Sequence, residues 1–208
     1  MQYWISTLIT VLVIYIAISI ALYYIQDYVL FKPEKLSKDF QFDYKNQETK
    51  EYNLETRDGA VINGLRFFPK GESKGVVIYL KGNSKSIKGW GKFAVDFTRH
   101  DYNVLMVDYR GFGKSTGKIS ELGLYQDAQM LYDVLLENID ASKITVLGRS
   151  LGTGVAVDLV SKNKVKRLIL ETPFSSFADL AQSRFKIIPV KVLLKYSFPN
   201  KDKLKKVN

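Results

Sequence analysis

The stretch KITVLGRSLGTGVAVDLV, residues 143–160, decides the fold of this 208-residue chain. It begins with a short apolar run, passes through Gly-Arg-Ser-Leu-Gly, and continues with small and apolar residues. A strand that turns into a helix within a few residues can hold a serine in a strained conformation above the edge of a sheet. We therefore predict a strand over residues 143–148, a helix over residues 151–161, and Ser150 at the turn between them as a candidate nucleophile.

Two glycines flank this serine at the positions that such a turn requires. Gly148 and Gly152 leave room for neighbouring backbone, with which larger side chains would collide. The N-terminus of the predicted helix adds positive partial charge where an oxyanion would form. The pattern Gly-x-Ser-x-Gly alone is also compatible with a structural serine in a tight turn. Its position between a buried strand and a helix of small residues favours the nucleophile.

The rest of the chain alternates between apolar runs and helical patterns. Asp58-Gly59 lies between two strand-like runs and predicts a β-hairpin. Further strands are predicted at residues 75–80, 103–108 and 167–171, helices at residues 86–98 and 122–138, and short helical pieces over residues 174–198. A hairpin followed by strand–helix–strand units predicts the α/β class, with a mostly parallel sheet that carries helices on both faces.

The first 26 residues carry no charged side chain. Residues 3–25 would form a helix of roughly 35 Å, which is enough to cross a hydrocarbon core of about 30 Å. A cleavable signal peptide needs a basic start and a shorter apolar core, and a buried core helix of this length is rarer still. We predict a single-pass transmembrane anchor over residues 1–27, a linker over residues 28–50, and a catalytic domain over residues 51–208.

The charge pattern bears on location and partners. Lys32, Lys35 and Lys38 closely follow the apolar segment, and the positive-inside rule therefore favours a cytoplasmic domain. The formal net charge is +10, but the basic residues are scattered and form no nucleic-acid-binding motif. A basic domain held at a membrane is expected to rest against anionic lipid head groups, so we predict the lipid bilayer as a partner and no nucleic acid. The sequence has no cysteine, which excludes disulfides and thiolate metal sites. No metal or cofactor site is predicted.

Three more segments have the order and spacing of a known family. They are LKGNSKS at residues 80–86, DYRGFGKSTG at residues 108–117 and LETPFSS at residues 170–176. Together with the serine turn, they resemble the α/β-hydrolase superfamily. The chain is most similar to the small membrane-anchored serine hydrolases of the serine aminopeptidase-like and depalmitoylase-like group. The resemblance covers residues 52–208.

This resemblance implies a reaction and the residues that perform it. Ser150 would attack a carbonyl carbon, and the backbone N–H groups of Asn83 and Leu151 would form the oxyanion hole. Three glycines would support these groups: Gly82, Gly148 and Gly152. The implied reaction is hydrolysis of an acyl ester, a thioester or a peptide-like amide through an acyl-enzyme, without a cofactor.

A serine hydroxyl needs a base to take its proton, and the usual base is histidine. The one histidine of the chain, His100, enters the strand at residues 103–108 at its N-terminal edge, whereas Ser150 leaves its own strand at the C-terminal edge. In a parallel sheet these edges lie about 17–20 Å apart, while proton transfer needs contact near 3 Å. Asp108 and Glu171 lie near strand C-terminal ends, but a carboxylate does not replace imidazole as a proton shuttle.

In the family, the triad acid and histidine follow two further strands, and none of these is found in this chain. We therefore expect a hydrolase that is C-terminally incomplete, and a chain that is inactive as given. Lysine can activate a serine in some enzymes, so Lys81, which stands where the family has histidine, is the alternative base. The alternative function is a non-catalytic, membrane-tethered interaction module with a hydrolase fold.

Overall fold

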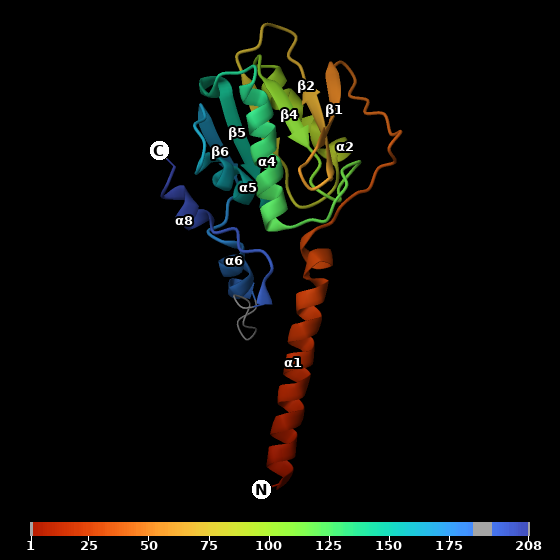
Figure 1. The fold of residues 1–208 in the computed structure, drawn as a ribbon, viewed down its shortest axis with the longest axis vertical. Coiled ribbons are helices and arrows are strands. Elements are labelled where there is room, and N and C mark those ends of the chain that lie inside the picture. Colours follow the sequence, from red (N-terminus) through yellow and green to blue (C-terminus); the bar gives the residue numbers. More distant parts are fainter. Residues whose placement is uncertain (1, 185–192, 208) are drawn as a thin grey trace.

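The computed structural model describes residues 2–184 and 193–207. Six strands in these residues form one sheet in the order β1-β2-β4-β3-β5-β6 (Figure 1). The strands are β1 (Thr49–Glu55), β2 (Val61–Phe67), β3 (Val76–Leu80), β4 (Asn103–Val107), β5 (Ile144–Arg149) and β6 (Arg167–Glu171). The β1–β2 and β2–β4 pairs are antiparallel, and the three pairs among β3, β4, β5 and β6 are parallel. The predicted α/β class with a mostly parallel sheet is confirmed.

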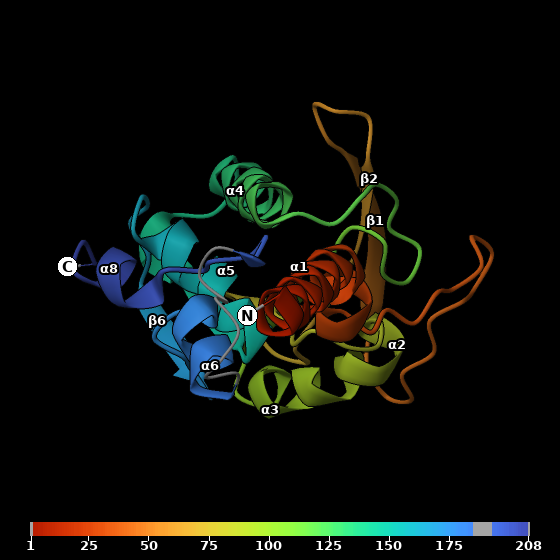
Figure 2. The same cartoon turned by 90° about the horizontal axis from the view of Figure 1, so that it is seen from below.

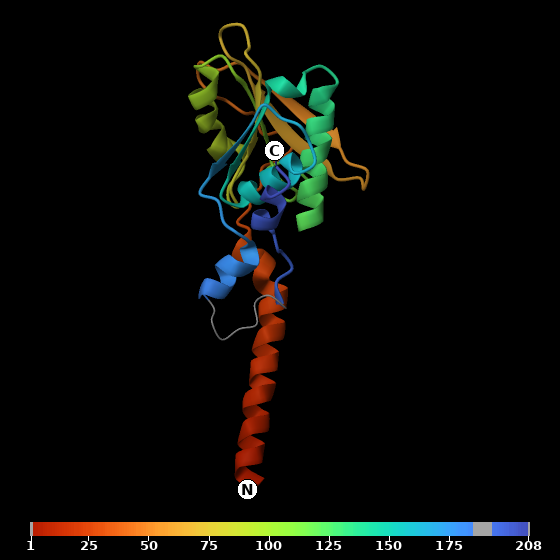
Figure 3. The same ribbon diagram turned by 90° about the vertical axis from the view of Figure 1, so that its left-hand side faces the viewer.

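Helices cover both faces of this sheet, as Figures 2 and 3 show. The α-helices are α1 (Gln2–Leu30), α2 (Ile87–Trp90), α3 (Val95–Thr98), α4 (Glu121–Leu136), α5 (Leu151–Val160), α6 (Phe177–Arg184) and α8 (Asn200–Leu204), with 3₁₀ turns at η1 (Gly91–Ala94) and η2 (Ala141–Lys143). Because side chains alternate along a strand, Val76 and Ile78 of β3 join the core under α4 and α5, whereas Val77 and Tyr79 join the core under α2 and α3.

Residues 86–98 were expected to form one helix, and here the structure differs. They form α2, η1 and α3 in succession. Glycine weakens a helix, and both Gly89 and Gly91 lie in this stretch. Gly91 also lies against the ring of Tyr44, with which a Cβ at this position would collide. The predicted helical pieces over residues 174–198 include α6, while residues 185–192 lie outside the described part of the chain.

Helix α1 leads away from the domain as a long rod (Figures 1 and 3). Within the described residues, it is the one helix long and apolar enough to span a membrane, with 28 residues from Tyr3 to Leu30 and a mean hydropathy of 2.6 in its most apolar window. None of that window is buried against the rest of the protein. Residues 28–30, which were expected to begin the linker, belong to this helix.

The segment between α1 and β1 packs on the domain over much of its length. Phe31 is 4% exposed and belongs to the core under α4 and α5. Phe42 and Tyr44 pack against the core on the opposite face. The chain enters at the edge where the parallel strands end, because Lys32 bridges Ser84, shortly after β3. This edge therefore carries both the attachment of α1 and the end of β5 that precedes Ser150.

Candidate active site

Ser150 lies at a sharp turn between β5 and α5. Its backbone has φ 52° and ψ −117°, a strained conformation for a residue with a side chain. The Ser150 N–H donates to the Glu171 carbonyl at 2.9 Å, and the Ser150 carbonyl accepts from Thr153 N–H at 2.9 Å and from its hydroxyl at 2.7 Å. These bonds hold the turn, and the serine side chain is exposed. The strand, turn and helix predicted around Ser150 are therefore present.

The two flanking glycines are both required by close backbone contacts. A Cβ on Gly148 would lie 2.5 Å from the Gly152 carbonyl oxygen and 2.7 Å from Ala156 Cβ. A Cβ on Gly152 would overlap the Leu80 carbonyl oxygen and lie 2.7 Å from the Lys81 carbonyl oxygen. Outside its own residue and the two chain neighbours, a real Cβ essentially never comes within 3.0 Å of another heavy atom. The helix therefore packs directly on the end of β3, which brings the next loop to Ser150.

That loop, residues 81–86, passes directly beside the serine, and we call it the oxyanion loop because Asn83 within it is the expected oxyanion-hole donor. A Cβ on Gly82 would lie 3.1 Å from Trp90 Cζ2 and 3.8 Å from Ser150 Cβ. Asn83 follows and is half-buried. Leu151 is the first residue of α5, so its N–H has no partner within the helix. The structure thus brings Ser150 and Leu151 close to the Gly82–Asn83 turn, while the role of the Asn83 and Leu151 N–H groups as an oxyanion hole stays a prediction.

Lys81 lies beside this site but turns its ammonium group into the interior. The side chain is fully buried, with Nζ 3.5 Å from Asp108 Oδ1 and 4.0 Å from the centre of the Phe112 ring. Nζ also donates to the Lys85 carbonyl at 3.1 Å. Burial lowers the pKa of Lys81 to about 8, although Asp108 opposes this shift. None of these contacts involves the exposed Ser150, and the geometry gives no support to Lys81 as its base.

The two carboxylates near the strand ends are also engaged elsewhere. Asp108 is fully buried; its Oδ1 accepts from the Ile87 N–H at 2.9 Å, while its Oδ2 has no hydrogen-bond partner among the described residues. Burial raises the pKa of Asp108 to about 6, even with Lys81 beside it. Glu171 is exposed and lies 3.3 Å from Arg149 Nε. Neither carboxylate makes a described contact with the Ser150 hydroxyl.

His100 lies at the opposite edge of the sheet from Ser150. In the parallel register Val76 pairs with both Asn103 and Ile144, so β4 and β5 begin at the same level on the two sides of β3. His100 precedes β4 in an exposed turn, whereas Ser150 follows the last residue of β5. The six residues of β5 span about 20 Å at roughly 3.3 Å each. The only histidine of the sequence is thus too far away to accept the serine proton.

Three side chains that the sequence analysis did not predict as part of the site lie next to the serine turn: Trp90, Phe93 and Arg149. The Trp90 indole N–H donates to the Ser84 carbonyl at 2.8 Å, which fixes the ring over Gly82. The guanidinium of Arg149 lies 5.3 Å from the Trp90 ring centre and 4.8 Å from that of Phe93. The helical pattern of residues 86–98 predicts that Trp90 and Phe93 pack against the domain. No local sequence pattern predicts that they lie near Ser150.

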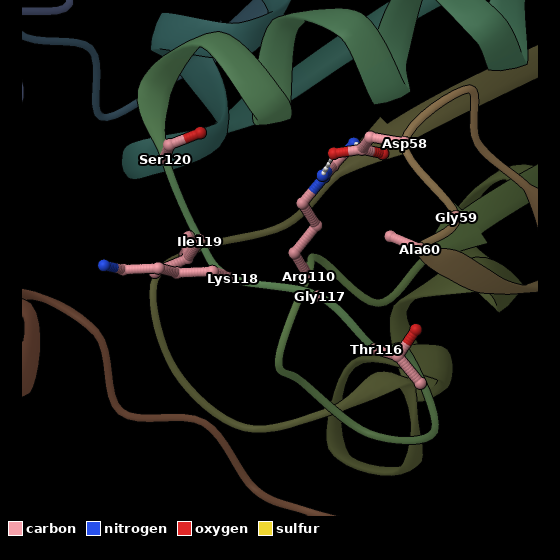
Figure 4. Close-up of a pocket in the computed structure, with 9 residues that line it drawn as sticks. All are labelled: Asp58, Gly59, Ala60, Arg110, Thr116, Gly117, Lys118, Ile119 and Ser120. Atoms are coloured by element: carbon pink, nitrogen blue, oxygen red, sulfur yellow. Dashed lines mark hydrogen bonds and ion pairs between the residues drawn. The ribbon is translucent and has the colours of Figure 1, made fainter.

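Arg110 of the DYRGFGKSTG segment links two elements of the fold through ion pairs. Its side chain is 5% exposed, and its guanidinium donates two hydrogen bonds of 2.8 Å to Asp127 and hydrogen bonds of 2.5 and 3.1 Å to Asp58. These contacts tie the β1–β2 turn to α4. Arg110 and Asp58 also line a cavity of about 530 Å³, with Lys118 and Ser120 on its other side (Figure 4). Ser150 is not part of its lining, so this cavity is separate from the candidate active site.

Among the described residues, no group of three or more His, Cys, Asp or Glu side chains is placed to hold a metal ion.

Comparison with known proteins places the chain among hydrolases. The family described as alpha/beta hydrolase fold matches residues 75–202. Protein bem46 of Schizosaccharomyces pombe is 33% identical over 155 residues, which cover 71% of this chain and 50% of that protein. The lysophosphatidylserine lipase ABHD12 of Gallus gallus is 34% identical over 139 residues, which cover 64% of this chain and 35% of that protein.

A solved structure agrees with this likeness. An alpha-beta hydrolase from Vibrio vulnificus superimposes with a TM-score of 0.64 at 25% identity, over 76% of this chain and 60% of that one. The chain spans about half the length of curated relatives that it matches, 56% of one and 50% of another.

Proposed function

The chain belongs to the α/β-hydrolase family, and from this premise we propose that it is a serine hydrolase with Ser150 as its nucleophile. The observation that supports this most is the backbone of Ser150, at φ 52° with Gly82 packed beside it. A strained backbone at an exposed polar residue is often found where function requires it. The resemblance and the comparisons support hydrolysis as the class of reaction.

In the proposed reaction, the Ser150 hydroxyl oxygen attacks the carbonyl carbon of an ester, a thioester or an amide. The Ser150 proton passes to a base, and the carbonyl oxygen becomes an oxyanion held by the N–H groups of Asn83 and Leu151. The same base then gives its proton to the leaving alcohol, thiol or amine, and water hydrolyses the acyl-enzyme. Loss of one oxyanion donor costs about 10²–10³ in kcat in enzymes of this kind.

The base and the triad acid are proposed to come from sequence that follows Asn208. Three observations support this proposal. His100 lies at the far edge of the sheet, and the Lys81 ammonium is buried against Asp108 and Phe112. The relatives with which the chain aligns are also considerably longer. The relative from Gallus gallus is a lysophosphatidylserine lipase, which supports an acyl chain in the substrate proposed here.

We also propose that α1 is a single-pass membrane anchor, with the domain on the cytoplasmic side. On membranes washed with alkaline carbonate, the full chain is expected to stay in the pellet. Replacing Ile14 and Ile18 in the middle of α1 by lysine should release it, because each charge at the centre of a bilayer costs about 2.5–3.5 kcal/mol. Recovery of the unmodified chain in the wash would exclude an integral anchor.

The function itself is tested by labelling with a fluorophosphonate, which reacts with activated serines. Two forms are compared, the 208-residue chain and the product of the same reading frame continued beyond Asn208. We expect strong labelling of the longer form, little or none of the shorter form, and none in Ser150→Ala. Without the triad partners, the oxyanion hole and binding leave only about 10³–10⁴-fold catalysis over water.

Two other outcomes would change the proposal. Strong labelling of the 208-residue chain that is lost in Ser150→Ala would place the base within these residues, and Lys81 would be the first to replace. Absence of labelling in both forms would instead favour the non-catalytic, membrane-tethered module.

A further inference from the structure

The segment that leaves α1, residues 30–36, runs between two loops of the candidate active site. On one side, the Lys32 N–H donates to the Asn83 carbonyl at 2.9 Å, and the Lys85 N–H donates to the Lys32 carbonyl at 3.0 Å. On the other side, the Gly113 N–H donates to the Glu34 carbonyl at 2.8 Å, and the Leu36 N–H donates to the Gly113 carbonyl at 3.0 Å. The segment, called the strap below, therefore joins the oxyanion loop to the loop after β4.

Two side chains strengthen the side that faces the oxyanion loop. The Asn83 side-chain amide donates to the carbonyl of Leu30 at 2.6 Å. Leu30 is the last residue of α1, so Asn83 satisfies one of the carbonyl groups that a helix end leaves open. From the strap, Glu34 Oε2 accepts from the Ser86 hydroxyl at 2.7 Å and from the Ser86 N–H at 3.2 Å. These hydrogen bonds lower the pKa of Glu34, so the carboxylate is charged at neutral pH.

The strap is itself held at its start. Phe31 is buried, and its ring centre lies 4.9 Å from that of Tyr196. Tyr196 also donates to Asp27 of α1 at 2.9 Å, and the Lys195 N–H donates to Gln26 at 2.8 Å. The last turn of α1 is thus fixed to the domain, and the strap begins from a defined point.

We propose that the strap positions the oxyanion hole, with Glu34 as its main positioning residue. This rests on the proposed function, in which the Asn83 N–H binds the oxyanion. The Asn83 carbonyl and side chain are both held by the strap region, so the direction of its N–H is set from the membrane side of the domain. Ser86 fixes the other end of the same loop, and it does so through Glu34. The membrane helix and the oxyanion hole are therefore parts of one connected structure.

Glu34 allows a test with a close rescue variant. Both bonds to Ser86 go to Oε2, and the nearest described contact of Oε1 is Lys88 Nζ at 3.6 Å. Glu34→Gln can therefore keep both acceptor bonds, whereas Glu34→Ala loses them. The matched control is Glu51→Ala. It also removes a half-buried carboxylate with two partners, because Glu51 accepts from Asn63 at 2.6 Å and from Lys114 at 2.8 Å, but it lies on β1.

The first measurement is amide hydrogen exchange of the full chain in detergent micelles. In Glu34→Ala, the amides of residues 82–86 are expected to exchange at least about tenfold faster, with β3 and β5 unchanged. Glu34→Gln should be close to wild type, and Glu51→Ala should leave the oxyanion loop as it is. Unchanged exchange of the loop in Glu34→Ala, or an equal increase throughout the sheet, would overturn the proposal.

The second measurement is the rate of fluorophosphonate labelling in whichever form of the protein reacts. We expect Glu34→Ala to lower the maximal labelling rate about tenfold with little change in the concentration of half-saturation, and Glu34→Gln to restore it. An unchanged maximal rate with a faster-exchanging loop would show that the strap does not position the oxyanion hole. If Ser150 reacts in no form, the proposed function fails, while hydrogen exchange still decides whether the strap holds the loop.

Discussion

Replacing Lys81 by methionine is expected to lower the free energy of unfolding by about 3–5 kcal/mol, because it leaves a buried carboxylate without its counter-charge. Asp108 is fully enclosed, and its Oδ2 has no hydrogen-bond partner among the described residues. Methionine is close to the lysine stem in size, so packing against Phe112 is largely kept. In a chain of this length, a loss of about 3 kcal/mol lowers the melting temperature by about 6–12 °C.

The matched control is the double variant Lys81→Met/Asp108→Asn. Asparagine removes the charge but can still accept from the Ile87 N–H, the bond that Asp108 Oδ1 makes at 2.9 Å. We expect the double variant to recover most of the lost stability. The stability of the single and the double variant is measured by thermal unfolding in micelles, followed by the fluorescence of Trp90. A single variant as stable as wild type, or a double variant no better than the single one, would contradict this account.

The pairing of Lys81 with Asp108 also predicts how the loss of stability in Lys81→Met depends on pH. Burial raises the pKa of Asp108 to about 6 in the folded protein, whereas an unperturbed aspartate titrates near 3.9. The folded state therefore binds this proton more tightly, and the stability that protonation contributes is full below pH 4 and is lost as the pH rises through about 6. Removing Lys81 raises this pKa further. The deficit of Lys81→Met should consequently be smaller at pH 5 than at pH 7.5.

The sequence predicted the serine turn because its determinants are local. The strand, the Gly-Arg-Ser-Leu-Gly turn and the following helix occupy 18 consecutive residues, and each glycine is required by a backbone contact near its own position or at the end of β3. The parallel order of the sheet follows from the same alternation of strands and helices. Once the strands are known to be parallel, their direction alone predicts that His100 lies far from Ser150.

The contacts that the sequence did not predict join distant parts of the chain. Lys81 is the alternative base in the sequence analysis because it stands where the family has histidine, and only the fold shows that its ammonium pairs with Asp108, 27 residues away, in the interior. The segment expected to be a linker is polar in composition, yet it carries Phe31, Phe42 and Tyr44. Those three aromatic residues were the available signal that it packs on the domain, as the structure shows.

Gly152→Val is expected to cost more than about 3 kcal/mol of stability and to disrupt the candidate active site. A Cβ on Gly152 would overlap the Leu80 carbonyl oxygen and lie 2.7 Å from that of Lys81, and both obstacles are backbone that cannot turn aside. Overpacking of a core typically costs about 1–3 kcal/mol where side chains can adjust. Here α5 must move away from the end of β3, and the contact between Gly82 and Ser150 must open with it.

A matched glycine elsewhere separates this steric effect from the general effect of replacing glycine. A Cβ on Gly89 would lie 3.2 Å from Lys85 Cδ, in the middle of a flexible side chain that can move. Because Gly89 lies in α2, and alanine favours a helix over glycine by up to about 1 kcal/mol, Gly89→Ala should leave the melting temperature unchanged or slightly higher. Gly152→Val should lower it by at least about 6 °C. Equal melting temperatures for the two variants would mean that α5 does not pack on β3 as closely as described. The packing of α5 on the end of β3 would then not explain why the oxyanion loop lies against Ser150.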